Sequence, residues 1–239
     1  MMAAPKIVSR EEWLKARQQL LSEEKDFTRL RDQLSARRRA LPWERVEKTY
    51  RFDGPNGTEA LSDLFEGRSQ LVVYHFMFGP NWDAGCPHCS FWADNFNGIG
   101  IHLNHRDVTM VVVSRAPYAK LAAYKNRMGW SFKWVSSAPC DFNFDYQASF
   151  KDAEVEKHDM FYNYTNQDTG TSEREGASVF HKDAKGQMFH TYSTYARGID
   201  LLNTAYNYID LTPKGRDEGD RGQYWVRRHD EYEGALSRH

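Results

Sequence analysis

Cysteine, long apolar runs and an excess of either charge are all scarce in this sequence. Its 239 residues include three cysteines, which are too few for a disulfide scaffold. In a reducing compartment a close cysteine pair is more typical of catalysis or metal binding than of structure. The longest apolar run, residues 71–78, is interrupted by Tyr74 and His75 and falls far short of a membrane span. We therefore expect no membrane-spanning segment.

Charge is nearly balanced, with 32 lysine and arginine residues against 33 aspartate and glutamate residues and a net charge of -1. This balance argues against nucleic acid or an anionic membrane as the main partner and favours a small molecule or a protein. The first residues also lack the apolar middle of a secretory signal, because residues 1–6 lead directly into the charged residues 9–12. We expect a cytoplasmic protein.

Residues 9–41 carry the pattern of one long amphipathic helix. Ser9 and Glu12 form a capping-box signature, and Pro42 ends the pattern. The basic residues on its other faces are interspersed with acidic ones, which indicates a solvated surface. The apolar stripe fits both a helix-mediated homodimer and packing along the same domain. The stripe consists of Trp13, Leu20, Phe27, Leu34 and Leu41.

Strand and helix patterns alternate after Pro42, which predicts an α/β domain with parallel strands. We divide the chain into an N-terminal helical arm (1–42), a core domain (43–211) and a C-terminal tail (212–239) packed on that domain. Residues 158–175 show no clear helical or strand periodicity, which indicates a long irregular loop. The expected strands are 46–52, 71–78, 108–113, 132–135 and a hairpin at 177–180 and 188–192; the expected helices are 86–96, 117–128 and 199–209.

The chemistry is concentrated in Cys86-Pro87-His88-Cys89, which follows a buried strand and opens a helix. Cysteines at i and i+3 lie on one helical face within reach of a disulfide. The helix N-terminus would stabilise the Cys86 thiolate and lower its pKa. Pro87 suits the first helical turn, and a protonated His88 would add positive charge. We predict attack by Cys86, a mixed disulfide, and resolution by Cys89.

Metal binding is the main alternative for the cysteine pair, because two such cysteines form half of a tetrahedral zinc site. A copper site with two thiolates and one imidazole is a further option. Cys140 alone reads as a small buried residue, although it could also resolve a peroxidase cycle. Zinc would need histidines such as His75, His102 or His105, and copper would need His181 or His190.

Several longer motifs resemble one family over nearly the whole chain. The chain is similar to the predicted dithiol-disulfide oxidoreductases that carry the domain of unknown function numbered 899, a branch of the thioredoxin-like superfamily. The resemblance implies a thioredoxin-like mixed sheet flanked by helices, with the long N-terminal helix and an irregular tail. The motifs that carry it are 61–65, 74–78, 85–94, 141–145 and 225–232.

Two neighbouring families share part of the site. Cys86-Pro87-His88-Cys89 resembles the active-site tetrapeptide of the periplasmic oxidant DsbA, but residues 176–179 lack the cis-proline that thioredoxins place opposite their cysteines. The loop 78–86 resembles the peroxiredoxin loop, yet Asp83 stands where peroxiredoxins carry threonine. The peroxiredoxin arginine near Gly176 would have to be replaced by Arg115, Arg174 or Arg197.

We therefore predict a thiol-disulfide oxidoreductase with Cys86 as nucleophile and Cys89 as resolving thiol, tuned by Pro87 and His88. No cofactor or metal is expected in this interpretation, and the substrate is a small-molecule or protein thiol or disulfide. The alternatives are a peroxiredoxin-like thiol peroxidase at Cys86 and a non-redox protein that binds copper or zinc. The sequence does not set the direction of electron flow.

Overall fold

The computed structural model describes residues 5–233, so residues 1–4 of the predicted arm and 234–239 of the predicted tail lie outside the described part. The chain divides into two compact units, Met1–Pro42 and Trp43–His239. The first unit consists mainly of helix α1 (Arg10–Arg39), which begins with the predicted capping box: Glu12 N–H donates to Ser9 Oγ, and Ser9 N–H donates to Glu12. None of the residues of α1 is buried.

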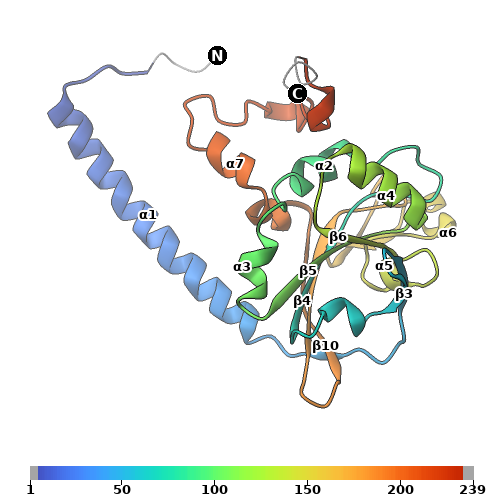
Figure 1. Cartoon of the computed structure of the whole chain (residues 1–239). Coiled ribbons are helices and arrows are strands. Elements are labelled where there is room, and N and C mark those ends of the chain that lie inside the picture. The colour runs from blue at the N-terminus through green and yellow to red at the C-terminus, as the bar shows by residue number, and fades with distance from the viewer. Residues whose placement is uncertain (1–4, 234–239) are drawn as a thin grey trace. The chain divides into compact units, whose positions relative to one another are not determined.

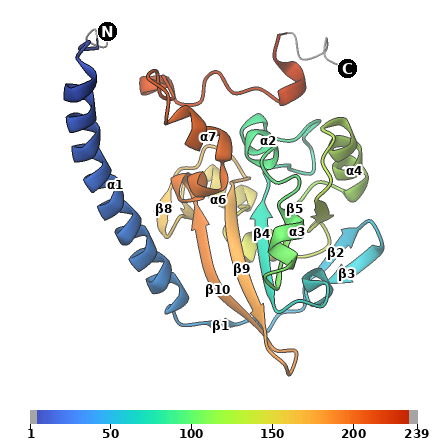
Figure 2. The same cartoon turned by 60° about the vertical axis from the view of Figure 1, so that its left-hand side comes forward.

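The second unit contains the sheet that positions the cysteine pair (Figures 1 and 2). Strand β4 (Gln70–His75) runs parallel to β5 (Val108–Ser114) and antiparallel to β9 (Gly176–Lys182), which forms a hairpin with β10 (Met188–Tyr195). The order β10-β9-β4-β5, with helix α2 (Pro87–Ala93) between β4 and β5, is that of a thioredoxin-like domain. The predicted mixed α/β fold is thus confirmed.

Further strands extend this sheet at both edges. On one side β6 (Lys133–Ser136) is parallel to β5, and β2 (Arg51–Gly54) and β3 (Gly57–Ala60) follow; on the other, β1 (Glu44–Arg45) pairs with β10. The remaining elements are η1 (Asp63–Phe65), α3 (Gly100–Asn104), α4 (Tyr118–Arg127), α5 (Phe142–Asp145), α6 (Asp152–Glu156), β7 (Met160–Tyr162), β8 (Thr165–Gln167), η2 (Ala196–Leu202), α7 (Thr204–Ile209), η3 (Gly219–Arg221) and η4 (His229–Glu231).

Two hydrophobic clusters cover the two faces of the sheet. Because successive strand side chains point to opposite faces, β4 places Leu71 and Val73 in one cluster and Tyr74 in the other. The Tyr74 cluster also contains both cysteines of the motif and the aromatic residues Trp92, Trp130 and Trp134. The cysteine pair is therefore built into a core face. No helix within residues 5–233 is long and apolar enough to cross a membrane.

The structure corrects several predicted boundaries. Residues 158–175 contain the β7–β8 hairpin, whose turn residues Asn163 and Tyr164 both have positive φ without a glycine to signal it. The predicted helix 199–209 is divided at Asn203, whose side chain accepts from Tyr206 N–H and caps α7. The predicted strand 46–52 begins only at Arg51.

Helix α2 ends at Ala93, before the predicted end near Phe96. The Asn95 side chain supplies the reason, since its Nδ2 donates to the backbone oxygens of Phe91 and Trp92. These side-chain bonds occupy carbonyls that the next helical turn would otherwise use. With seven residues, α2 is a short helix, so hydrogen bonds have to contribute much of the stabilisation of the Cys86 thiolate.

Candidate redox site

Cys86 occupies the residue directly before α2, and Pro87 takes the first helical position, as predicted. The Cys86 N–H donates to the Met77 oxygen at 3.0 Å, which folds the loop 78–85 back on the end of β4. Gly85 allows this approach, because a Cβ there would lie 2.7 Å from the Phe76 ring and 2.9 Å from the Tyr124 ring. A glycine before Cys86 is therefore a packing requirement.

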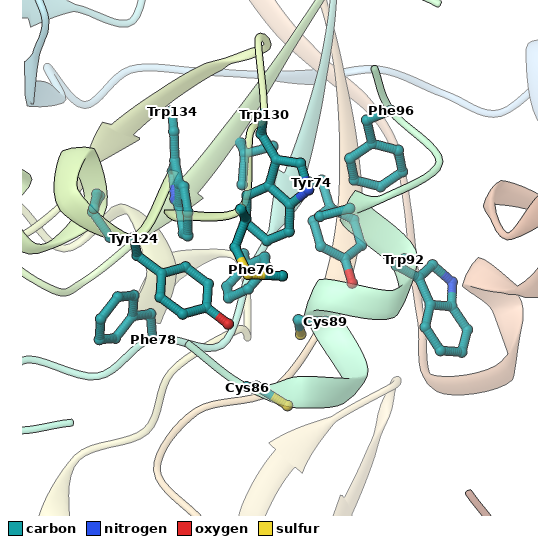
Figure 3. Packing of buried hydrophobic residues seen from close by; sticks show 14 of the residues in the cluster. Tyr74, Phe76, Phe78, Cys86, Cys89, Trp92, Phe96, Tyr124, Trp130 and Trp134 are labelled. Carbon is teal, nitrogen blue, oxygen red and sulfur yellow. The ribbon is translucent and has the colours of Figure 1, made fainter. Parts of the chain in front are cut away.

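Both thiols are free and withdrawn from solvent, Cys86 with 8% and Cys89 with 2% of its surface exposed. Figure 3 shows the two sulfur atoms at the edge of the aromatic cluster. The Met77 N–H donates to the Cys89 sulfur at 3.4 Å. Only Cys86 retains some contact with solvent, which suits the nucleophile, whereas Cys89 sits behind it.

The two cysteines differ strongly in acidity. The pKa of Cys86 is lowered well below its usual value, first by a hydrogen bond from the Cys89 thiol and also by His88, against an opposing effect of burial. The pKa of Cys89 is raised well above its usual value, mainly by burial. The environment thus favours the thiolate form at Cys86 and the protonated form at Cys89.

His88 lies next to the nucleophile. Its Nδ1 is 4.0 Å from the Cys86 sulfur, and the hydrogen bond to that sulfur raises the pKa of His88. Its other ring nitrogen, Nε2, is 3.4 Å from the backbone oxygen of Gln223 in the C-terminal tail. The tail therefore orients the imidazole beside the thiolate.

A cavity of about 500 Å³ opens beside the two cysteines. Its walls come from the end of β4, from residues 174–175 before β9, from η2 and α7, and from the tail segment 216–223. The lining residues include three arginines and three carboxylates: Arg174, Arg197, Arg216, Glu175, Asp200 and Glu218. Such a cavity falls within the size range of small-molecule sites.

The start of β9 takes the place where thioredoxins carry the cis-proline. No peptide bond among residues 5–233 is cis, and Arg174 and Glu175 line the cavity instead. Arg174 Nη2 lies 3.5 Å from Glu175 Oε1, and its guanidinium carbon lies 5.0 Å from the centre of the Tyr162 ring. At the start of β9 the protein thus places a charged pair, Arg174 and Glu175, in the wall of the cavity beside the two cysteines.

Other candidate residues lie elsewhere. Cys140 packs against the opposite hydrophobic cluster, and burial raises its pKa. Arg115 pairs with the buried Glu173 at 2.8 Å, whereas Arg197 joins Arg174 in the cavity wall. The five histidines considered as metal ligands do not line this cavity, and no metal-ligand group of three or more His, Cys, Asp or Glu residues occurs within the described chain.

Tyr74, Glu175 and the tail residues Arg216 and Gln223 are parts of the cavity that sequence reasoning missed. The sequence places Tyr74 in a buried strand and in the motif 74–78 without linking it to the cysteines, and Gln223 is 135 residues from His88. The alternation of β4 could have identified Tyr74, because it places this residue on the face that α2 covers. The sequence carries no comparable signal for the tail.

Comparisons with known proteins extend the family resemblance. The model of a family described as "Bacterial protein of unknown function (DUF899)" matches residues 2–232. No curated protein sequence matches this chain.

Solved structures resemble the chain only loosely. Peroxidoxin BcpB from Mycobacterium tuberculosis is 12% identical at a TM-score of 0.46, with 71% of this chain and 97% of that chain covered. A Xanthomonas campestris peroxiredoxin Q is 12% identical at a TM-score of 0.49, and the match covers 69% of this chain and 93% of that chain. A putative thiol:disulfide interchange protein DsbE from Chlorobium tepidum is 11% identical at a TM-score of 0.40, and the match covers 71% of this chain and 96% of that chain. None of these similarities decides an activity.

Proposed function

Because the chain belongs to the DUF899 family, whose description assigns no function, we propose its activity from its own site: thiol-disulfide exchange at Cys86 and Cys89. The observation that carries the proposal is the asymmetry of the pair, with a lowered pKa at Cys86 and a raised pKa at Cys89 in one cavity. A stabilised thiolate is both the attacking group and the better leaving group.

The first step is attack of the Cys86 thiolate on a substrate disulfide. The substrate S–S bond breaks, a Cys86–substrate disulfide forms, and one substrate thiolate leaves. His88, protonated beside Cys86, can supply a proton to that leaving sulfur. Its placement between the thiolate and the Gln223 oxygen favours this role.

The second step releases the product. The Cys89 thiol attacks the Cys86 sulfur and its proton passes to the leaving substrate sulfur, which closes the Cys86–Cys89 disulfide and frees the second substrate thiol. Two electrons pass from the dithiol to the substrate, and an external thiol reductant restores the protein. Burial and, after it, the neighbouring Cys86 keep the pKa of Cys89 high. Formation of the mixed disulfide removes the negative charge from Cys86 and so weakens the second of these effects.

A thiol peroxidase is the second candidate, because the cavity places an arginine near the thiols. Arg174 lines the same cavity as Cys86, and against the opposing effect of burial its pKa is raised first by the charge of Glu175. In this alternative the Cys86 thiolate attacks a peroxide oxygen, the O–O bond breaks, and an alcohol or water leaves while Cys86 becomes a sulfenic acid. The Cys89 thiol then attacks the Cys86 sulfur, which forms the disulfide and releases water. Both candidates end in the same protein disulfide.

The test is a thiol-labelling titration of metal-free protein across a graded glutathione redox series, read by intact mass. We expect one two-electron transition that links Cys86 to Cys89 and is lost in Cys89→Ser. Cys140→Ser is the matched control and should keep the transition. Two cysteines that stay reduced and unpaired throughout would refute the proposal, and rapid peroxide-dependent sulfenic acid at Cys86 in Cys89→Ser would favour the peroxidase.

A further inference from the structure

The cavity beside the cysteine pair contains hydrogen-bond donors that the protein leaves unused. Tyr74 is fully buried and lines the cavity, and its hydroxyl makes no hydrogen bond of ordinary geometry within the described residues, although its pKa is raised first by burial and then by the neighbouring Cys89. Figure 3 shows this hydroxyl on the side of the ring that faces the Cys89 helix. A buried hydroxyl without a partner costs free energy, so an occupant that accepts its hydrogen bond would be stabilised.

Arg174 supplies a second unused donor. Its Nε is shielded from solvent and has no partner among residues 5–233, and its contact with Glu175 is long, at 3.5 Å. The side chain is held in place by the Tyr162 ring. A guanidinium fixed in this way is suited to a carboxylate, which it can bind with two parallel hydrogen bonds.

The carboxylates of the cavity wall, in contrast, already have donors. Glu175 accepts from the Tyr162 hydroxyl, Asp200 accepts from Arg216, and Glu218 accepts from the Tyr206 hydroxyl and the Trp225 indole. The groups of the cavity wall that lack partners are therefore donors. An occupant with negatively charged oxygens can accept from them, whereas a cation cannot.

The tail limits the size of the occupant. Residues 216–223 form one wall, and the His88 imidazole reaches the Gln223 oxygen. With only 8% of Cys86 exposed, the sulfur offers little surface to a folded protein disulfide. A small molecule can instead approach it through the cavity of about 500 Å³.

From these observations we infer that the substrate is a low-molecular-weight disulfide that carries a carboxylate, bound by Arg174 and the Tyr74 hydroxyl. The inference rests on the proposed exchange activity and specifies its substrate class. The carboxylate anchors the molecule, and its S–S bond lies at Cys86. Exchange then follows the two steps given above: two substrate thiols form as the protein disulfide closes.

The test uses three disulfides of similar size that differ in charge: dithiodipropionate, hydroxyethyl disulfide and cystamine. Reduced protein is mixed with each, and the rate of Cys86–Cys89 closure is followed by quenched mass analysis. We expect dithiodipropionate to react about ten-fold faster than hydroxyethyl disulfide, in line with one charge-assisted hydrogen-bond site. The dicationic cystamine should be slowest. An equal or reversed order would overturn the inference.

Two variants test whether Arg174 and Tyr74 cause the preference for dithiodipropionate. Arg174→Gln and Tyr74→Phe should each bring the ratio of the dithiodipropionate rate to the hydroxyethyl disulfide rate close to one, and this ratio, taken within each variant, is independent of any change in the reactivity of the thiols. Arg221→Gln is the matched control, because Arg221 stacks on Tyr224 and is not part of the cavity lining. If both site variants keep the full preference, the carboxylate is recognised elsewhere and the inference fails.

Suberate separates binding from exchange, since it is dithiodipropionate with the two sulfurs replaced by CH₂ groups. It should slow iodoacetamide labelling of Cys86 in the wild-type protein and do so less in Arg174→Gln. If none of the three disulfides oxidises the pair, the proposed activity fails. Suberate protection then still decides whether the cavity accepts carboxylates, and its absence would overturn the inference as well.

Discussion

Arg228 donates from Nη2 to the backbone oxygen of Gly85 at 2.7 Å, and so joins the C-terminal tail to the residue directly before Cys86. The same guanidinium donates from Nε to the Tyr124 hydroxyl at 2.8 Å. Tyr124 in turn contacts Ser90 of α2 through its hydroxyl. One tail side chain thus holds the loop and the helix that carry the two cysteines.

Arg228→Ala should loosen this connection. The Gly85 oxygen and the Tyr124 hydroxyl lose a charged donor in a half-buried position, which we expect to cost about 1–3 kcal/mol in the free energy of unfolding. Cys86 should also be alkylated several-fold faster by iodoacetamide at a fixed thiolate fraction. Arg227→Ala is the control, because the Arg227 guanidinium donates to nearby tail oxygens only. Equal behaviour of the two variants would contradict this role of Arg228.

His88→Ala should raise the pKa of Cys86, because it removes a hydrogen bond and a positive charge that favour the thiolate. The thiolate absorbance should then appear at higher pH, and labelling in mildly acidic buffer should slow roughly ten-fold. His229→Ala, which removes a partner of Asp94 at the surface, should leave the titration unchanged. An unaltered Cys86 titration in His88→Ala would show that the imidazole does not stabilise the thiolate.

Substitutions of Cys89 should separate its two functions. Its thiol is the largest cause of the lowered pKa of Cys86. Cys89→Ala removes this donor and should move the Cys86 titration to higher pH, whereas Cys89→Ser keeps a donor and should move it less. Both variants should accumulate the mixed disulfide, since neither can resolve it. Identical titrations of the two variants, measured by thiolate absorbance, would argue against the hydrogen bond.

His75 should make the protein sensitive to acid. Burial lowers its pKa from 6.5 to about 3, so between these values the unfolded chain binds a proton that the folded protein does not. Stability is therefore lost as pH falls below 6.5, and the loss from this group reaches about 2 kcal/mol near pH 5. Urea unfolding across this range should show a shallower loss for His75→Gln than for the exposed control His105→Gln. Parallel curves would contradict the assignment.

The sequence predicted the cysteine pair as the candidate site because its signals are local. A cysteine pair at i and i+3, a proline at the first helical position and a preceding apolar strand all fall within residues 71–93. The alternation of apolar strands with helices likewise predicted the mixed sheet, and the capping box at Ser9 predicted the start of α1. Such features depend on neighbouring residues, whose spacing the chain itself sets.

The cavity could not be derived in the same way. Its walls join residues 174–175, η2 and the tail to the cysteine motif, across separations of more than 80 residues. The tail residues Arg216 and Gln223 carry no local pattern that links them to Cys86, since each reads as an ordinary loop residue.

The sequence by itself therefore determined which reactive groups are available: two thiols three residues apart and a histidine between them. Only the tertiary structure decided how acidic each thiol is and what can approach it. The pKa of Cys89 is raised mainly by burial, and the folded tail supplies one wall of the cavity beside Cys86 and a contact to His88. The burial of Cys89 and the surroundings of Cys86 are both set by chain segments that meet only after folding, so the spacing of the motif predicts neither.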